Sequence, residues 1–254
     1  YDKTPLELIT PSDNNLNLIF STAENLTINT RDLTFQPWVD GKPWTGDSLT
    51  VNGGDSLRIS LRADISAALD SNAAASKHYL EFVYTVRGDS YEVGFDINFV
   101  GLEDFILSDN RVDLQWHNRM LRQEQSREGT RSERTYTSIY YKPVEDDVDD
   151  LSAGNKDAAS DQLKTQLEWV AFKQQYFSAI LTAEAEPFEN AEIAVHTNKK
   201  DTTRNYLTDM DATLAIPYSH DTKALHMGFY FGPTKCRDLR AFDRDFDKML
   251  PLGW

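Results

Sequence analysis

A two-residue alternation of apolar and polar side chains is the feature that most constrains the fold. Between Tyr91 and Phe99 every second residue is large and apolar, and the residues between them are charged, small or polar. This period is typical of a β-strand with one face on a core and the other in water. A second apolar run covers residues 78–86, and Arg87 to Ser90 join the two runs. The pattern predicts an antiparallel hairpin.

Further segments of the chain carry strand patterns. They cover residues 16–21, 49–52, 57–62, 112–116, 135–141, 191–197, 213–218 and 225–231. Many short strands without alternating helices favour an antiparallel sandwich over a parallel α/β sheet. We therefore predict a mainly β fold in a single domain over residues 1–254, with its strands within about residues 1–232.

One segment near the C-terminal end has the spacing of an amphipathic helix instead. Thr234 can cap its start and Pro251 ends the run. We predict one helix over about residues 234–250, packed against the sheet. Its apolar face consists of Leu239, Phe242, Phe246, Met249 and Leu250.

The segment from residue 141 to residue 161 is rich in Asp, Ser, Gly, Asn and Ala. Such a composition is typical of a solvated loop. A calcium-binding loop would need Asp at alternate positions followed by Gly, and that spacing is absent. We therefore predict a loop without a ligand.

Charge and cysteine content exclude several classes of partner. The formal net charge is −15, which repels phosphate backbones and makes a nucleic-acid partner unlikely on electrostatic grounds. The single cysteine, Cys236, cannot form an internal disulfide. No apolar stretch approaches the ~20 residues that span a bilayer, and no signal peptide precedes the first strand. Because the chain starts at Tyr1 and stops abruptly at Trp254, we expect a fragment of something longer.

The residues that could carry chemistry form no recognisable catalytic motif. Five histidines are present without a metal-binding spacing; His220 and His226 are six residues apart across an expected turn. Cys236 lies between Lys235 and Arg237, but no base is evident beside it. No nucleotide-binding or hydrolase motif occurs. We therefore predict no catalytic residue, no metal and no cofactor.

A cluster of arginines is the only locally basic part of this acidic chain. It consists of Arg111, Arg119, Arg122, Arg127, Arg131 and Arg134, interleaved with Glu124, Glu128 and Glu133. A charge-balanced exposed hairpin or loop is the simpler interpretation. The alternative is a docking surface for an acidic partner or a lipid headgroup.

From Leu167 onward the sequence carries several short motifs. Residues 169–177 read W-V-A-F-K-Q-Q-Y-F, which resembles a W-x-x-x-K-Q-Q-Y-F signature in the large periplasmic domain of the YidC membrane-protein insertases. Residues 230–233 resemble its Y-x-G-P element, and the final Gly253-Trp254 resembles its end, just before the second transmembrane helix. Residues 116–142 are similar to versions from Bacteroidetes-type bacteria. The resemblance is loosest before about residue 49.

The resemblance implies a fold, a location and partners. The fold would be an antiparallel β-supersandwich, similar to galactose mutarotase, with a C-terminal helix. The location would be the periplasmic face of the bacterial inner membrane, with a membrane helix at each end of the domain. The partners would be the transmembrane insertase core of the same chain, membrane-protein clients and the Sec subunits SecDF and SecYEG. The parent protein would insert and fold membrane proteins without covalent chemistry.

The resemblance also suggests roles for particular residues. We expect Trp169, Tyr176 and Phe177 to be core residues, with Gln175 in the same structural motif. Gly232 and Pro233 are expected to form a turn that aims the helix, and Gly253 and Trp254 to mark the membrane interface. We expect the domain to be a docking and spacing module. Its possible partner contacts are Arg119, Arg122, Arg237, Arg240 and Arg244.

Other functions remain open at this stage. The shared architecture allows a carbohydrate-binding domain or an aldose epimerase. A further alternative is a glycan-binding lipoprotein fragment of the outer surface, which would have a sugar-stacking aromatic cleft. An epimerase needs a carboxylate base and a histidine acid in one cleft, and the sequence does not identify such a pair. Five tryptophans could supply sugar-binding platforms, although sandwich cores use the same residue type.

Overall fold

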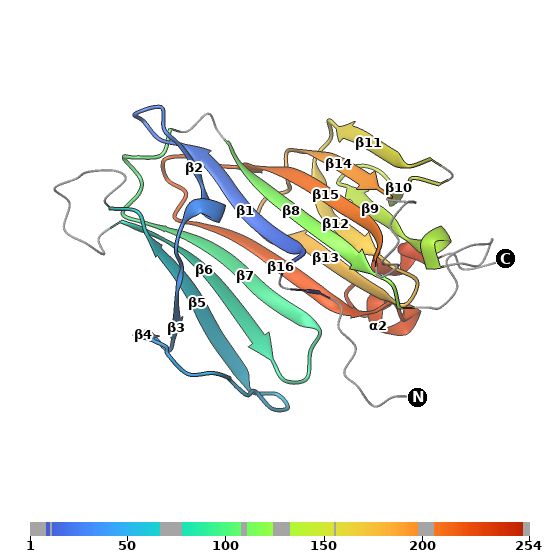
Figure 1. Ribbon diagram of the computed structural model, residues 1–254, viewed down its shortest axis with the longest axis horizontal. Coiled ribbons are helices and arrows are strands. Elements are labelled where there is room, and N and C mark those ends of the chain that lie inside the picture. The colour runs from blue at the N-terminus through green and yellow to red at the C-terminus, as the bar shows by residue number, and fades with distance from the viewer. Residues whose placement is uncertain are drawn as a thin grey trace.

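The computed structural model describes residues 9–10, 12–66, 78–107, 111–123, 133–154, 156–197 and 206–250. Its architecture is a sandwich of two antiparallel β-sheets (Figure 1). The predicted mainly β, antiparallel sandwich is confirmed. No helix among the described residues is long and apolar enough to cross a bilayer.

The smaller sheet has six strands in the order β11-β14-β15-β8-β1-β2. Its strands are β1 (Asn14–Ser21), β2 (Thr27–Asn29), β8 (Arg111–Leu121), β11 (Ala158–Leu163), β14 (Asn190–His196) and β15 (Tyr206–Pro217). In β8 the buried residues alternate strictly with half-exposed ones. The smaller sheet therefore has one face on the core and one in water.

The larger sheet has ten strands in the order β10-β9-β12-β13-β16-β7-β6-β5-β3-β4. Its strands are β3 (Gln36–Val39), β4 (Lys42–Pro43), β5 (Ser56–Asp64), β6 (Tyr79–Arg87), β7 (Glu92–Val100), β9 (Ser138–Pro143), β10 (Asp149–Leu151), β12 (Leu167–Lys173), β13 (Phe177–Ala183) and β16 (Ala224–Pro233). Short 3-10 turns cover Thr30–Asp32, Glu133–Tyr136 and Phe246–Met249. The predicted hairpin is confirmed, because β6 and β7 pair antiparallel.

The main core lies between the inner faces of the two sheets. Its centre includes a stack of Trp116 from the smaller sheet on Phe172 from the larger sheet, with ring centroids 3.9 Å apart and planes 17° apart. Phe229 meets the same Trp116 edge-on at 5.8 Å. These aromatic contacts join the two sheets.

One predicted strand and one predicted loop are wrong. Residues 49–52 pair with no strand in the described part of the chain; they lead into a turn in which Asp55 N–H donates to Asn52 O. The predicted loop over residues 141–161 contains β10 and most of β11, and its first residues belong to β9. Both β10 and β11 lie at sheet edges, where charged side chains remain in water. High charge therefore did not prevent strand formation there.

The predicted C-terminal helix is much shorter than its apolar pattern suggests. The α-helix α2 covers only Cys236–Arg240, and the chain then bends before the 3-10 turn Phe246–Met249. Asp243 and Asp245 have φ angles of +53° and +61°, which a continuous right-handed helix does not allow. The apolar residues at helical spacing do pack on the sheet, but a bent backbone brings them there.

Candidate functional site

The outer face of the larger sheet, which points away from the smaller sheet, carries a second apolar cluster. Residues 234–250, called the C-terminal segment below, cover this face near β12, β13 and β16 (Figure 1). Because the segment covers the outer face, β12 is buried on both faces. The fully buried members of the cluster are Trp169, Ala171, Ile180, Tyr230, Leu239, Phe246 and Met249.

Trp169 is the centre of this cluster. It is 0% exposed, and its ring meets Phe246 edge-on at 5.3 Å. Its indole Nε1–H donates to the main-chain oxygen of Arg244 at 2.9 Å. The same side chain thus supplies both packing and a directional bond to the C-terminal segment, and its predicted core position is confirmed.

An ion pair holds the middle of the C-terminal segment. The Arg244 guanidinium donates to both carboxylate oxygens of Glu184, at 2.7 and 2.6 Å. Thr182 Oγ1 donates to the same carboxylate at 2.6 Å. Burial opposes ionisation of Glu184, but the hydrogen bonds from Arg244 and Thr182 outweigh it and lower the pKa of this carboxyl. A fork-to-fork pair of this kind fixes orientation as well as position.

The end of β16 directs the chain into the C-terminal segment. Gly232 and Pro233 were expected to form a turn, but they belong to β16 and pair with Ser178 and Phe177. The Tyr230 hydroxyl donates to Pro233 O at 2.7 Å. A Cβ on Gly232 would lie 2.7 Å from the Tyr230 ring, so only glycine allows this close approach.

The turn from Lys173 to Phe177 ties the larger sheet to its surroundings. Lys173 Nζ donates to Tyr136 O at 3.2 Å, and Gln174 Nε2 donates to Leu121 O at 2.8 Å. Both side chains are almost fully buried. Leu121 is the last residue of β8 in the smaller sheet, and Gln174 directly follows β12 in the larger sheet. Gln174, the first glutamine of the signature, therefore links the two sheets.

The same turn also holds the start of the C-terminal segment. Thr234 N–H donates to Tyr176 O at 2.8 Å, and its Oγ1 donates to Gln175 O at 3.0 Å. The predicted helix cap by Thr234 is therefore wrong, because the residue before α2 is Lys235 and has no side-chain cap bond. The Thr234 hydroxyl is used to bind the turn instead.

Burial changes the titration of Lys173. The residue is 2% exposed, and its amine lies 5.5 Å from the Tyr140 ring. Desolvation lowers the pKa of this amine to about 8, against the opposing effect of the nearby Asp150 charge. The signature lysine therefore titrates closer to neutral pH than an ordinary lysine, but it is still mostly charged at pH 7.

The remaining residues of the predicted motif differ in their burial. Tyr176 is 49% exposed, so the expected core position is wrong. Phe177 is half-buried at the start of β13, and Gln175 Nε2 donates to the Tyr176 hydroxyl at 3.0 Å. Gly253 and Trp254 lie outside the described residues.

The five arginines expected to contact a partner do not form one site. Arg237, Arg240 and Arg244 lie on the C-terminal segment, and Arg119 lies on the smaller sheet with Arg122 shortly after it. The Arg237 side chain is 95% exposed and that of Arg240 is 66% exposed. Arg240 pairs with Asp247 at 3.0 Å. Arg244 is occupied by Glu184, so Arg237 and Arg240 are the more accessible of these three arginines.

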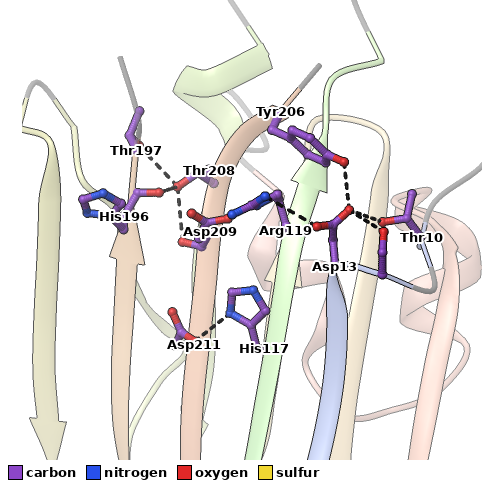
Figure 2. A network of polar contacts seen from close by, with 11 residues as sticks. Thr10, Asp13, His117, Arg119, His196, Thr197, Tyr206, Thr208, Asp209 and Asp211 are labelled. Atoms are coloured by element: carbon purple, nitrogen blue, oxygen red, sulfur yellow. Dashed lines mark hydrogen bonds and ion pairs between the residues drawn. The ribbon is translucent and has the colours of Figure 1, made fainter. Parts of the chain in front are cut away.

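Arg119 belongs to a polar network on the outer face of the smaller sheet. Its Nε donates to Asp209 at 2.7 Å, and Nη1 donates to Asp13 at 3.4 Å. Tyr206 donates to the same Asp13 at 2.8 Å. Figure 2 shows these side chains pointing to one side of neighbouring strands, with the His117–Asp211 pair below them. Arg119 therefore neutralises local acid and joins the N-terminal residues to the sheet.

Two hollows bear on the enzyme alternative. A groove of about 290 Å³ beside Arg244 is lined by Glu92 and Glu184, and no described histidine lines it. His226 lines another hollow of about 330 Å³, but its Nδ1 bonds to Asp96 at 2.7 Å and the ring is exposed. No group of three or more potential metal ligands occurs within the described ranges.

Sequence reasoning missed Glu184, Thr182 and the burial of Lys173. Glu184 and Arg244 are sixty residues apart, and neither has a motif around it. Only the antiparallel order β12-β13-β16 brings them together. Lys173 stands at the end of an apolar run, which is the one signal that could have suggested burial.

Comparisons with known proteins give a consistent family match. The model of the family described as YidC periplasmic domain matches residues 2–254. A membrane protein insertase YidC from Parabacteroides distasonis is 30% identical over the whole chain, and one from Porphyromonas gingivalis is 32% identical. The chain spans 37% of the length of each of these relatives.

The matches among solved structures include distant ones. A GH36 α-galactosidase, AgaA from Geobacillus stearothermophilus, in complex with raffinose has a TM-score of 0.46 at 7% identity, over 94% of this chain and 35% of that one. An α-mannosidase from Enterococcus faecalis has a TM-score of 0.44 at 7% identity, over 94% of this chain and 27% of that one.

Proposed function

Because this chain belongs to the YidC periplasmic domain family, we propose that it acts as a non-catalytic docking and spacing module of a membrane protein insertase. It stands on the periplasmic face of the inner membrane, tethered at both ends. The transmembrane core of the full-length insertase performs the insertion of membrane-protein clients.

The observation that carries this proposal is the attachment of the C-terminal segment. Trp169 and Glu184 hold it at two points, and Gln175 and Tyr176 hold its start. A segment fixed in this way transmits the position of the sandwich to whatever follows it in the chain. Flexible linkers do not transmit orientation.

The segment also supports a contact with Sec subunits. Arg237 and Arg240 project into water from α2, in a chain with a net charge of −15. Exposed cations on a rigid element suit an acidic protein surface. We place the contact with SecDF, and through it SecYEG, on these two residues; Arg119, Arg122 and Arg244 play a supporting structural part.

Pull-down of SecDF by the full-length insertase tests the docking role. The double variant Arg237→Ala/Arg240→Ala should recover several-fold less SecDF, because exposed interface charges contribute to encounter and affinity. The matched control is Arg111→Ala/Lys223→Ala, whose side chains are 51% and 65% exposed elsewhere on the domain. Undiminished recovery with the first pair, or equal loss with the second, would contradict docking through α2.

A further inference from the structure

The two most exposed large apolar side chains of the described residues lie at one end of the sandwich. Tyr91 is 54% exposed and Tyr176 is 49% exposed. Tyr91 immediately precedes β7, and Tyr176 immediately precedes β13. Since β16 runs between these two strands, the tyrosines stand on either side of its last residues.

Backbone hydrogen bonds hold both tyrosines in place. Phe231 N–H donates to Tyr91 O at 3.0 Å, and Thr234 N–H donates to Tyr176 O at 2.8 Å. Two inter-strand spacings separate their strands, which is about 10 Å. A partner surface that meets these two side chains therefore needs little ordering of the protein.

Basic side chains stand beside the tyrosines. Lys235 and Arg237 follow directly after β16, and both are exposed. Lys235 has no ion pair with any described residue, and Arg237 pairs only with its neighbour Asp238, at 3.3 Å. In a chain with a net charge of −15, this combination of aromatic and cationic side chains is suited to an anionic surface.

The opposite end of the sandwich differs in its chemistry. Leu26 is 46% exposed and Leu107 is 40% exposed, and Leu107 N–H donates to Ser21 O at the end of β1. The exposed residues around them include Glu24 and Asp104. The exposed carboxylates at this end would be repelled by anionic headgroups. This end therefore provides a matched control.

We propose that the end carrying Tyr91, Tyr176, Lys235 and Arg237 rests on the lipid surface of the membrane. Tyrosine has an apolar ring and a polar hydroxyl, and it is enriched at the level of lipid headgroups. The two cations lie beside anionic headgroups, which compensates for the acidic remainder of the domain. This contact rests on the proposed function and adds an orientation to it: the β6–β7 and β12–β13 turns face the bilayer.

A fluorophore scan of the 254-residue chain tests the contact. Cys236→Ser removes the only cysteine, and single cysteines are then introduced as Tyr91→Cys, Tyr176→Cys, Leu26→Cys or Leu107→Cys. Each labelled chain is attached by a C-terminal histidine tag to nickel-chelating lipid, in vesicles of phosphatidylethanolamine and phosphatidylglycerol. An environment-sensitive label should shift to the blue, and be quenched by brominated lipid, at positions 91 and 176 and not at 26 or 107.

Each alternative outcome is informative. No shift at 91 and 176, or an equal shift at 26 and 107, overturns the proposal. A response of positions 91 and 176 to purified Sec subunits but not to vesicles makes the surface a protein contact, and also overturns it. If the lipid contact fails this test while the unmodified full-length insertase still recovers SecDF in the pull-down, the docking function stands without the lipid contact. Thermal melts confirm that each variant is folded. If the Tyr91→Cys variant is unfolded, the label at position 176 alone decides the outcome.

Charge provides a second readout with untethered chain. The variant Lys235→Ala, which leaves the docking arginines in place, should bind vesicles containing phosphatidylglycerol severalfold more weakly than the parent, because each basic residue near an anionic surface contributes severalfold to affinity. The difference should vanish on phosphatidylcholine vesicles. Equal binding of parent and variant to the anionic vesicles would contradict the part assigned to the cations.

Discussion

Replacing Trp169 with Ala is expected to lower the free energy of unfolding by about 3–5 kcal/mol, the usual range for a large buried aromatic. The side chain is fully buried between the larger sheet and Phe246, so its loss leaves a cavity. The variant also leaves the main-chain oxygen of Arg244 without its indole donor. Chemical denaturation followed by circular dichroism measures the change.

A matched variant separates packing from hydrogen bonding at this position. Trp169→Phe keeps much of the ring contact and removes the indole N–H, so it should cost clearly less than Trp169→Ala. Tyr176→Ala, at an exposed position, should cost the least. If Trp169→Ala were no more costly than Tyr176→Ala, the C-terminal segment would not be attached as described.

Replacing Lys173 with Met is expected to raise the free energy of unfolding at pH 7 by about 2 kcal/mol. Burial lowers the pKa of this amine to about 8, so holding it charged in the folded state at pH 7 is costly. Methionine removes that cost and loses the hydrogen bond to Tyr136 O, about 1 kcal/mol, together with the cation's contact with the Tyr140 ring. Denaturation at several pH values measures the gap between variant and parent.

The pH dependence follows from the sign of the shift. Because the folded pKa lies below the unfolded value, the penalty of Lys173 is complete below pH 8 and is relieved as pH rises toward the unfolded pKa. The advantage of Lys173→Met should therefore shrink by about 2 kcal/mol between pH 8 and pH 10. Buried tyrosines such as Tyr84, with a pKa raised to about 12, affect parent and variant alike. A gap that stays constant with pH would show that Lys173 is not desolvated.

The sequence was most informative where a strand has one face in water. The alternation in β7 and β8 follows directly from one buried and one solvated face; β7 was predicted within one residue at each end, whereas β8 was predicted only over residues 112–116 of its 11 residues. The edge strands β10 and β11 were missed, because their exposed polar residues read as a loop. Pairing with a neighbour, which a local pattern does not show, decided their structure.

The candidate site was predicted in its apolar positions and missed in its polar contacts. Phe246 and Met249 have helical spacing, which indicated a buried face correctly and a continuous helix wrongly. Packing onto Trp169 determined their positions, and positive φ angles at Asp243 and Asp245 accommodated the bend. The pairing of Glu184 with Arg244 depends on strand order, which single-sequence periodicity cannot provide.

Hydrogen exchange at the indole Nε1–H of Trp169, followed by nuclear magnetic resonance on the complete chain, tests the attachment of the C-terminal segment most directly. If the segment and the sheet form one rigid unit, this proton should exchange only through large-scale opening, far more slowly than the indole proton of the half-buried Trp44. Exchange as fast as that of Trp44 would mean that the segment lifts readily from the sheet, which contradicts a spacing module with a fixed orientation.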